Sequence, residues 1–239
     1  MPHPLVIIPT PIGNLEDITL RALRVLKEAD VVYAEDTRTT RKLFEHYGIE
    51  TPLRSFHLHN EHVVADEVAD KVADGAYVAL VSDAGTPAIS DPGFMAVRAC
   101  SVRGLQVTCL PGATAFVPAL VASALPAERF FFEGFLPNKK GRASRIDAIK
   151  EREVTSIIYE SPKRLAKLLG EIVEILGGER EVVVAREVSK IHEEFRKGTA
   201  AELLEYYLQY EPLGEIVVLI APKEKTERAH QNKYKVDNM

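Results

Sequence analysis

The sequence predicts an α/β protein made of two α/β domains, and two observations support this prediction. Short apolar runs alternate with helical patterns along most of the chain, which is typical of parallel strands joined by helices. Loops rich in Gly, Pro, Asp and Thr follow the predicted strands of the first half. The most pronounced of them, residues 82–93, has four Gly or Pro residues among its twelve and directly follows the apolar run 77–81.

The first half is expected to contain four strands, at residues 4–10, 31–34, 77–81 and 106–110. Helices are expected at about 19–29 and near 94–103. Between them, one helix is expected to run through His46 and end at Gly48, and another to begin after an N-cap at Asn60. The first of these helices has apolar residues at helical spacing, at Leu20, Leu23, Leu26 and Ala29. We therefore expect these side chains to face the core.

A domain boundary is expected near residues 124–129, where Ala-Leu-Pro-Ala-Glu-Arg interrupts the alternation. Strands are expected beyond it at 130–132, 155–159, 181–186 and 215–221, and helices at about 162–176 and 200–210. Ser161 and Pro162 provide an N-cap and a first-turn proline for the longer helix. The predicted domains are 1–124 and 125–222, followed by a polar tail at 223–239.

The composition is that of an ordinary globular protein, which we expect in the cytoplasm. The 239 residues are 46% hydrophobic and 27% charged, and no apolar run approaches the roughly 20 residues that span a bilayer. We expect no secretory signal, and the two cysteines, Cys100 and Cys109, form no metal or disulfide motif. The net charge of −5 offers no global attraction for nucleic acid, so RNA contacts would depend on local clusters.

A ligand site is expected where four loops meet at the carboxyl ends of strands, at 9–14, 35–38, 82–93 and 111–114. Each loop alone is compatible with an ordinary turn, but their common position favours one crevice. Neither G-x-x-x-x-G-K-[ST] nor G-x-G-x-x-G after the first strand is present, so no triphosphate or pyrophosphate is expected there. No metal is expected either, because the histidine-rich segment 57–62 has no common focus for its side chains.

Eight motifs occur in the order found in one known family. They are Pro9–Asn14, Glu35–Arg38, His59–Glu61, Ser82–Gly93, Pro111–Ala113, Glu133–Pro137, Glu160–Pro162 and Arg186-Glu187 with Lys190. In these motifs the chain closely resembles the ribosomal RNA methyltransferase branch of the tetrapyrrole (corrin/porphyrin) methylase superfamily. The resemblance covers about residues 4–222, and the match of Ser82–Gly93 is its most specific part.

The resemblance implies two α/β domains of tetrapyrrole-methylase type, with the cofactor in the cleft between them. It implies S-adenosylmethionine as methyl donor, and as acceptor the ribose 2′-hydroxyl of a cytidine in the decoding region of 16S rRNA, within the 30S subunit. It also implies a homodimer. The donor-binding residues that it indicates are Pro11, Ile12, Gly13, Asn14, Gly85, Thr86, Pro87, Ile89, Gly112, Ala113 and Thr114.

One position departs from the superfamily pattern. Small-molecule methylases of the superfamily usually have Gly-Asp-Pro where this chain has Gly85-Thr86-Pro87. A carboxylate contact to the donor is therefore absent at Thr86. Asp83 and Asp91 are both candidates to replace it.

Methyl transfer from a sulfonium requires no metal and depends mainly on holding the acceptor oxygen in line with the methyl group. The candidate catalytic residues are Asp36 and Glu160, because each closes a predicted strand, one in each domain. Each is a candidate general base and equally a candidate to hold Arg38 or Arg164 in place. We expect the positioning role to dominate.

RNA contacts are expected from basic side chains, at Arg38, Arg41, Lys42, Lys139, Lys140, Arg142 and Arg145. A solvated charged surface is the alternative for the basic run 139–152. Two other functions stay open, a tetrapyrrole methylase of the same fold and an RNA-binding module without catalysis. The basic run and Thr86 argue against the tetrapyrrole methylase.

Overall fold

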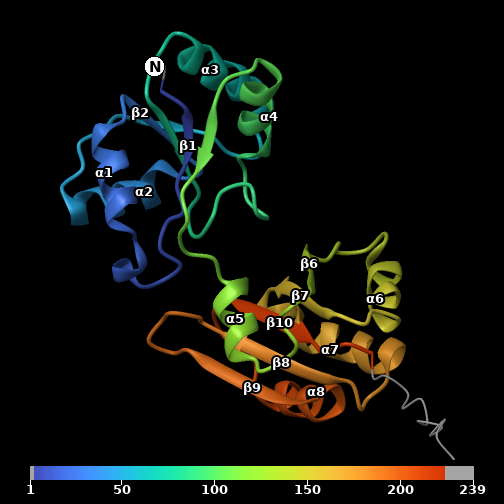
Figure 1. The fold of residues 1–239 in the computed structure, drawn as a ribbon. Helices are drawn as coiled ribbons and strands as arrows, with labels where there is room; N and C mark the ends of the chain where they lie inside the picture. The colour runs from blue at the N-terminus through green and yellow to red at the C-terminus, as the bar shows by residue number, and fades with distance from the viewer. Residues whose placement is uncertain (1–2, 224–239) are drawn as a thin grey trace, which may run out of the picture.

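The computed structural model describes residues 3–223 and contains two five-stranded sheets, one in each half of the molecule (Figure 1). The predicted polar tail lies outside the described residues, apart from Lys223. Among residues 3–223, no helix has the length and apolar character that crossing a membrane requires.

The first sheet is entirely parallel, with the strand order β3–β2–β4–β1–β5. Its strands are β1 (Leu5–Ile7), β2 (Val31–Ala34), β3 (Leu53–Ser55), β4 (Val78–Val81) and β5 (Val107–Cys109). The helices are η1 (Leu15–Asp17), α1 (Leu20–Glu28), α2 (Thr37–Tyr47), α3 (Glu61–Ala73) and α4 (Phe94–Val102). The predicted alternation is confirmed. Only β3 and the short 3₁₀ helix η1 are not predicted. β3 forms no apolar run, because two of its three residues are exposed.

Helices cover both faces of the first sheet. Leu5 and Ile7 of β1 pack in the cluster that includes α3 and α4, whereas Val6 belongs to the cluster with α1 and α2. Because successive strand residues point to opposite faces, a strand covered on both sides is apolar throughout. The carboxyl ends of the strands point toward the second half (Figure 1). The loops that follow the strands therefore lie between the two sheets.

The buried face of α1 differs from the expectation. Ala22, Val25 and Leu26 are buried, whereas Leu20 is 86% exposed. Leu20 directly follows the N-cap Thr19, whose hydroxyl accepts a hydrogen bond from the Ala22 amide. At 3.6 residues per turn, Leu20 lies on the side of α1 opposite Ala22, Val25 and Leu26, because a repeated spacing of three residues drifts by about 60° at each step.

The predicted helix caps are partly confirmed. Gly48 ends α2 in the left-handed region, with φ 59°, as expected for a C-terminal glycine. Asn60 occupies the N-cap position of α3 without a capping bond, because its side chain instead accepts from the His57 amide and donates to the Ser55 carbonyl. Ser161 likewise precedes α7 without a side-chain capping bond.

The second sheet is mixed, with the order β6–β7–β10–β8–β9, in which only β6 and β7 pair in parallel. Its strands are β6 (Phe130–Phe135), β7 (Thr155–Glu160), β8 (Glu181–Arg186), β9 (Glu194–Thr199) and β10 (Ile216–Ile220). The helices are α5 (Phe116–Ala122), α6 (Arg142–Lys150), α7 (Pro162–Leu176) and α8 (Ala200–Gln209). The sequence patterns do not predict α5, α6 or β9. β9 is a half-buried edge strand with charged residues, so it has no apolar run.

Helix α5 packs on the second sheet, although the predicted boundary at residue 124 places it in the first domain. Ala119 and Leu120 are buried in one cluster with Val183 and Leu219 of the second sheet. Helices α6, α7 and α8 cover the opposite face. The chain therefore passes from one sheet to the other between β5 and α5, and the Ala-Leu-Pro segment at 124–126 is only the loop after α5.

The two leucines of α1 allow a matched test of this packing. Leu26→Ala should destabilise the protein by about 2–5 kcal/mol, because it removes a fully buried side chain and leaves a cavity. Leu20→Ala should change stability by less than about 0.5 kcal/mol, because Leu20 is exposed. Urea unfolding of both variants measures the difference. Equal destabilisation by the two substitutions would contradict the buried face seen here.

Candidate active site

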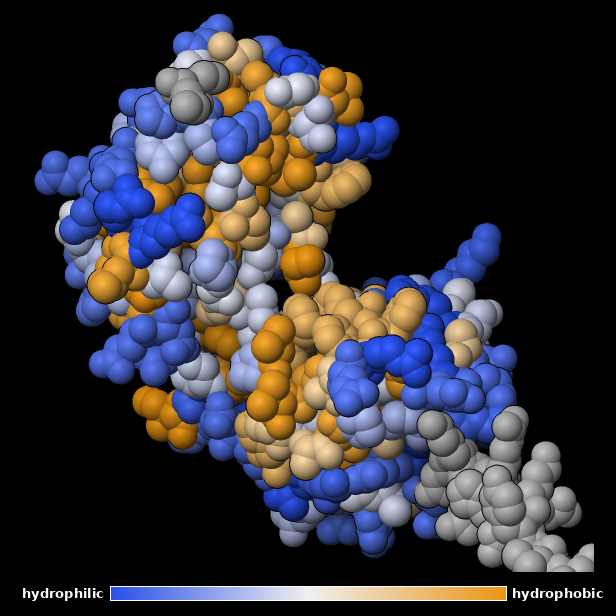
Figure 2. Space-filling model, viewed as in Figure 1, coloured by the Kyte–Doolittle hydropathy of each residue, from blue (hydrophilic) through white to orange (hydrophobic). Residues whose placement is uncertain are grey.

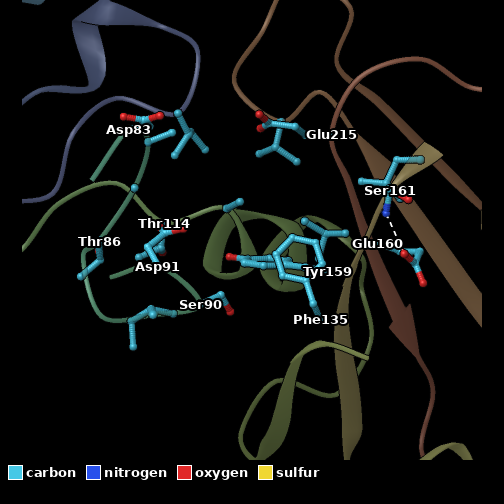
Figure 3. A pocket seen from close by; sticks show the side chains of 18 of the residues that line it. Asp83, Thr86, Ser90, Asp91, Thr114, Phe135, Tyr159, Glu160, Ser161 and Glu215 are labelled. Atoms are coloured by element: carbon cyan, nitrogen blue, oxygen red, sulfur yellow. Dashed lines mark hydrogen bonds between the residues drawn. The ribbon is translucent and has the colours of Figure 1, made fainter. Parts of the chain in front are cut away.

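A cavity of about 410 Å³ lies between the two halves, and both contribute to its walls (Figure 3). Figure 2 shows the hollow between the halves on one side of the molecule. The first half contributes Ile12, Glu35, Asp83–Thr86, Ile89–Asp91, Thr114 and Ala115. The second half contributes Phe135, Tyr159–Pro162, Val188 and Gly214–Val217. The volume is typical of a site for one small ligand.

Two loops of the first-half wall are joined by a pair of backbone hydrogen bonds. The Thr10 amide donates to the Gly85 carbonyl and the Gly85 amide donates to the Thr10 carbonyl, both at 2.9 Å. The buried Thr10 hydroxyl also donates to the Ser82 carbonyl, at 3.1 Å. Gly85 has φ 82°, a conformation that favours glycine, so the backbone of the 82–93 loop reaches the cavity here.

The 82–93 loop also carries backbone strain. Ala88 and Ser90 have φ values of 69° and 67°, in the left-handed region that residues with a Cβ rarely adopt. Each such residue costs on the order of 1 kcal/mol. Strain of this kind concentrates at functional sites, and here it lies in the loop that forms the cavity wall.

The loop after β5 is fastened to the same wall. The Thr86 hydroxyl donates to the Ala113 carbonyl at 3.0 Å. Gly112 packs so closely on Pro9 that an added Cβ would lie 2.6 Å from the Pro9 Cβ. The loops after β1, β4 and β5 therefore form one connected surface.

The predicted donor-binding residues divide into two groups. Those that line the cavity are Ile12, Asp83, Gly85, Thr86, Ile89 and Thr114. Those that do not are Pro11, Gly13, Asn14, Pro87, Gly112 and Ala113. Ala113 supports a lining residue, because its carbonyl accepts from the Thr86 hydroxyl, whereas Asn14 accepts from the Glu16 amide and begins η1. Contact of either group with a donor stays a prediction.

Carboxyl groups gather on the first-half wall. The Asp83 carboxylate accepts from the Asp36 amide at 3.0 Å, and the Glu35 carboxylate accepts from the Asp83 amide at 3.4 Å. Burial raises the pKa of both Glu35 and Asp83. Burial also raises the pKa of Asp91 to about 7, helped by the charges of Glu35 and Asp83. A positively charged ligand would relieve this repulsion by favouring the ionised carboxylates.

Comparison with known proteins places the chain in a family. The family described as Tetrapyrrole (Corrin/Porphyrin) Methylases matches residues 4–204. The chain belongs to the tetrapyrrole methylase family. The resemblance inferred from the motifs is thereby confirmed, and so are the two-sheet α/β fold and methyl transfer as the class of reaction.

Relatives with 43–49% identity from several bacteria share one name. The methylase is 49% identical over 220 residues to the Ribosomal RNA small subunit methyltransferase I of Pseudomonas aeruginosa, covering 91% of this chain and 78% of the relative. It is 44% identical over 220 residues to the protein of that name from Thermotoga maritima, covering 92% of this chain and 99% of the relative.

Solved structures with low sequence identity have the same fold. A diphthine synthase matches with a TM-score of 0.71 at 14% identity, covering 91% of this chain and 89% of that one. The uroporphyrin-III-C-methyltransferase of Thermus thermophilus matches with a TM-score of 0.64 at 20% identity, covering 90% of this chain and 93% of that one.

Asp36, a predicted catalytic residue, does not line the cavity of the methylase. It is the N-cap of α2, where its carboxylate accepts from the Arg38 amide at 2.8 Å and from the Arg38 guanidinium at 2.6 Å. The hydrogen bond from the Arg38 side chain lowers the pKa of Asp36 to about 2. This geometry is that of a carboxylate that holds Arg38 and the start of α2.

Glu160, the other predicted catalytic residue, does line the cavity, but its carboxylate is fully engaged. It accepts from Arg142 at 3.1 Å, from Arg164 at 2.6 Å and from the Ser161 amide at 2.8 Å, the bond drawn in Figure 3. Its side chain is completely buried. Two guanidiniums and one backbone amide engage its oxygens, so the carboxylate holds the start of α7 and has no free position for the proton of a hydroxyl.

The predicted RNA-contacting residues are not equivalent in the structure. Arg142 is only 4% exposed and pairs with Glu160 and Glu171, so it stabilises the interior instead of facing a phosphate. Arg145 pairs with the buried Glu133 at 2.5 Å but stays partly exposed. Exposed positions are Arg38, Arg41, Lys42, Lys139 and Lys140. Within the described chain, Lys139 and Lys140 make no ion pair.

The second-half wall contains aromatic side chains that the sequence patterns do not predict as site residues. Phe135 and Tyr159 lie next to each other in the cavity, with ring centroids 5.6 Å apart. Burial raises the pKa of Tyr159 to about 12. Tyr159 ends a predicted strand, which is the signal that indicates Asp36 and Glu160, whereas Phe135 lies in the family motif Glu133–Pro137.

The carboxyl cluster predicts how stability depends on pH. The pKa of Asp91 is about 7 in the folded state, compared with the ordinary value of 3.8. The folded state therefore keeps a proton that the unfolded state has released, and this contribution to stability is lost as the pH rises from about 4 to about 7. Asp91→Asn removes the titrating group. The melting temperature of the variant should exceed that of the wild type by a few degrees above pH 7, and the difference should shrink toward pH 4.

Asp147→Asn is the matched control for this measurement. Asp147 is exposed on α6 and makes no ion pair within residues 3–223. The control should follow the wild-type pH profile. If Asp91→Asn follows it as well, the carboxyl group of Asp91 is not held near neutrality by its surroundings.

Proposed function

We propose that the protein transfers a methyl group from S-adenosylmethionine to the ribose 2′-hydroxyl of a cytidine in the decoding region of 16S rRNA. Relatives with 43–49% identity that are named Ribosomal RNA small subunit methyltransferase I support this proposal. The structural observation that carries it is the wall of carboxyl groups formed by Glu35, Asp83 and Asp91 in the cavity between the two halves.

The residues of the cavity fit S-adenosylmethionine. When bound, this donor supplies an electrophilic methyl group on a positively charged sulfur. Asp83 and Asp91 provide negative charge for its cationic groups. They replace the aspartate that small-molecule methylases usually have at the position of Thr86. The apolar side chains of Ile12, Ile89 and Val188 provide surface for the adenosine.

The residues of the protein act on the acceptor mainly by positioning it. Asp36 is held ionised with a pKa of about 2, and the Glu160 carboxylate is occupied by two guanidiniums. We infer that both hold loops in place instead of accepting the proton of the hydroxyl. Holding two reactants in line provides a large part of the acceleration without a strong base.

The RNA partner is proposed to contact the exposed basic groups near the cleft. Lys139 and Lys140 follow β6, and Arg38, Arg41 and Lys42 belong to α2 in the other half. Arg145 is a weaker candidate, because Glu133 already pairs with it. The 30S subunit as the form of the substrate and a homodimer in the cytoplasm are proposals that rest on the family resemblance alone.

The proposed activity is tested by methyl transfer to purified subunits. Wild-type protein and labelled S-adenosylmethionine should label 30S subunits from cells that lack this modification, and nuclease digestion should yield 2′-O-methylcytidine. Tetrapyrrole acceptors should stay unlabelled. Labelling of a tetrapyrrole would favour the small-molecule methylase, and RNA binding without any labelling would favour a non-catalytic module.

The contribution of the lysines to RNA binding is tested separately. Replacing Lys139 and Lys140 by Ala should weaken RNA binding and reduce the slope of log affinity against log salt by about one to two units. Affinity for S-adenosylhomocysteine should not change. Arg21→Ala with Lys27→Ala is a control with the same change of charge, on exposed positions of α1. An RNA affinity and slope that match this control would show that the two lysines are only a solvated surface.

A further inference from the structure

Phe135 is the last residue of β6 and lies in the wall of the cavity with 52% of its surface exposed. Figure 3 shows it with Tyr159 on the second-half wall, opposite the side chains of the 82–93 loop. A large apolar side chain that is half exposed in the wall of a cavity offers a surface for a ligand. Its ring suits a planar, aromatic ligand in particular.

A β-bulge places Phe135 on this side of the sheet. The pairing of β6 with β7 shifts between Phe132 and Gly134. In regular alternation, residues three apart point to opposite faces, yet Phe132 and Phe135 both contact the ring of Tyr159, at 5.0 and 5.6 Å. Bulges commonly redirect a side chain next to an active site, and this one turns Phe135 into the cavity.

Gly134, which precedes Phe135, lies close to Ser90 of the 82–93 loop. It has φ 62°, and an added Cβ would lie 3.0 Å from the Ser90 hydroxyl of the opposite wall. A larger residue at this position would require the Ser90 side chain to move. The ring of Phe135 is thus held next to the loop that carries the predicted donor contacts.

The ring is also fixed from behind. Phe135 contacts Tyr159 at an interplanar angle of 62°, and Tyr159 contacts Phe132, which in turn packs on Phe116. This row of rings supports Phe135 on one side and leaves the other side open. A fixed aromatic ring loses little conformational entropy when a ligand stacks on it.

Positively charged side chains follow Phe135 closely in the sequence. Lys139 is four residues after Phe135, which places its Cα within about 14 Å of the ring-bearing residue. Aromatic rings beside cationic groups are how proteins hold single-stranded nucleic acid, since bases stack on the rings and phosphates contact the cations. The neighbouring groups thus favour a nucleotide as the ligand of Phe135.

The proposed reaction leaves the base of the acceptor nucleotide unmodified. A ribose can reach a donor inside the cavity only when its nucleotide leaves the neighbouring stack, so the exposed base needs a new partner. The predicted donor contacts occupy the first-half wall, and Phe135 is on the second-half wall. We propose that Phe135 stacks on the base of the target nucleotide and so holds its ribose at the donor; this inference rests on the proposed function.

The test compares three variants on 30S subunits. Phe135→Leu keeps an apolar side chain without a stacking face. It should lower kcat/KM for methylation roughly 5- to 150-fold, which is the range typical of replacing an aromatic side chain on which a base stacks. Phe135→Tyr keeps the ring and should stay within about threefold of the wild type. Phe131→Leu is the control, because Phe131 has a similar exposure on the same strand but does not line the cavity.

Two further measurements separate stacking from a structural role. Calorimetry with S-adenosylhomocysteine should give the wild-type affinity for all three variants. A short RNA with a fluorescent cytosine analogue at the target position should be quenched by the wild type and by Phe135→Tyr, but not by Phe135→Leu. If Phe135 had only a structural role, quenching would not depend on whether residue 135 carries an aromatic ring.

Each opposing result has a distinct meaning. An active wild type with unimpaired methylation and quenching by Phe135→Leu would overturn the stacking role alone. A change in oligomeric state of Phe135→Leu by light scattering, with quenching retained, would place Phe135 in a contact between copies of the chain and overturn stacking. A wild type that methylates no RNA would overturn the proposed function and this inference together.

Discussion

The paired hydrogen bonds between Thr10 and Gly85 are the constraint on which the site depends. They join the loop after β1 to the loop after β4 at 2.9 Å in each direction, and the two strands are neighbours in the sheet. The parallel sheet brings the two loops to the same edge, and the bridge then fixes their separation. The strained residues Ala88 and Ser90 follow this bridge in the same loop, so the bridge fixes the start of the strained segment.

The second half fixes its wall by a different interaction. Glu133 and Glu160 are buried carboxylates, and guanidiniums from α6, α7 and the loop after α6 pair with them. Burying such charges is costly unless each is paired and hydrogen-bonded, and removing one partner typically costs several kcal/mol. Arg142 is thus needed inside the protein. The basic segment that begins at Lys139 therefore divides into interior arginines and exposed lysines.

The two walls differ in the ligand that they can hold. The first-half wall presents carboxyl groups whose ionisation a cation would favour, and it contains no exposed aromatic ring among the labelled residues of Figure 3. The second-half wall presents Phe135 and Tyr159, and lysines follow it in the chain. Under the proposed function, the first-half wall of this cavity of about 410 Å³ suits the cationic donor and the second-half wall suits the RNA. Glu215 also lies on the second-half wall, so negative charge is not confined to one side of the cavity.

Local patterns in the sequence were enough to determine most units of the first half and the loops that form its wall of the cavity. Buried parallel strands are continuous apolar runs, and the loops after them carry the Gly, Pro and Asp that a cavity wall requires. Six of the predicted donor residues line the cavity for this reason. The family motifs determined the class of reaction, which the relatives confirm.

Only the tertiary structure decided which side of an element faces a partner. Arg142 is buried because Glu160 and Glu171 meet it from β7 and α7. Helix α5 covers the second sheet, and a bulge turns Phe135 into the cavity. Each of these outcomes depends on contacts between residues far apart in the chain. Periodicity and composition report only on neighbours along the sequence, so they could not determine them.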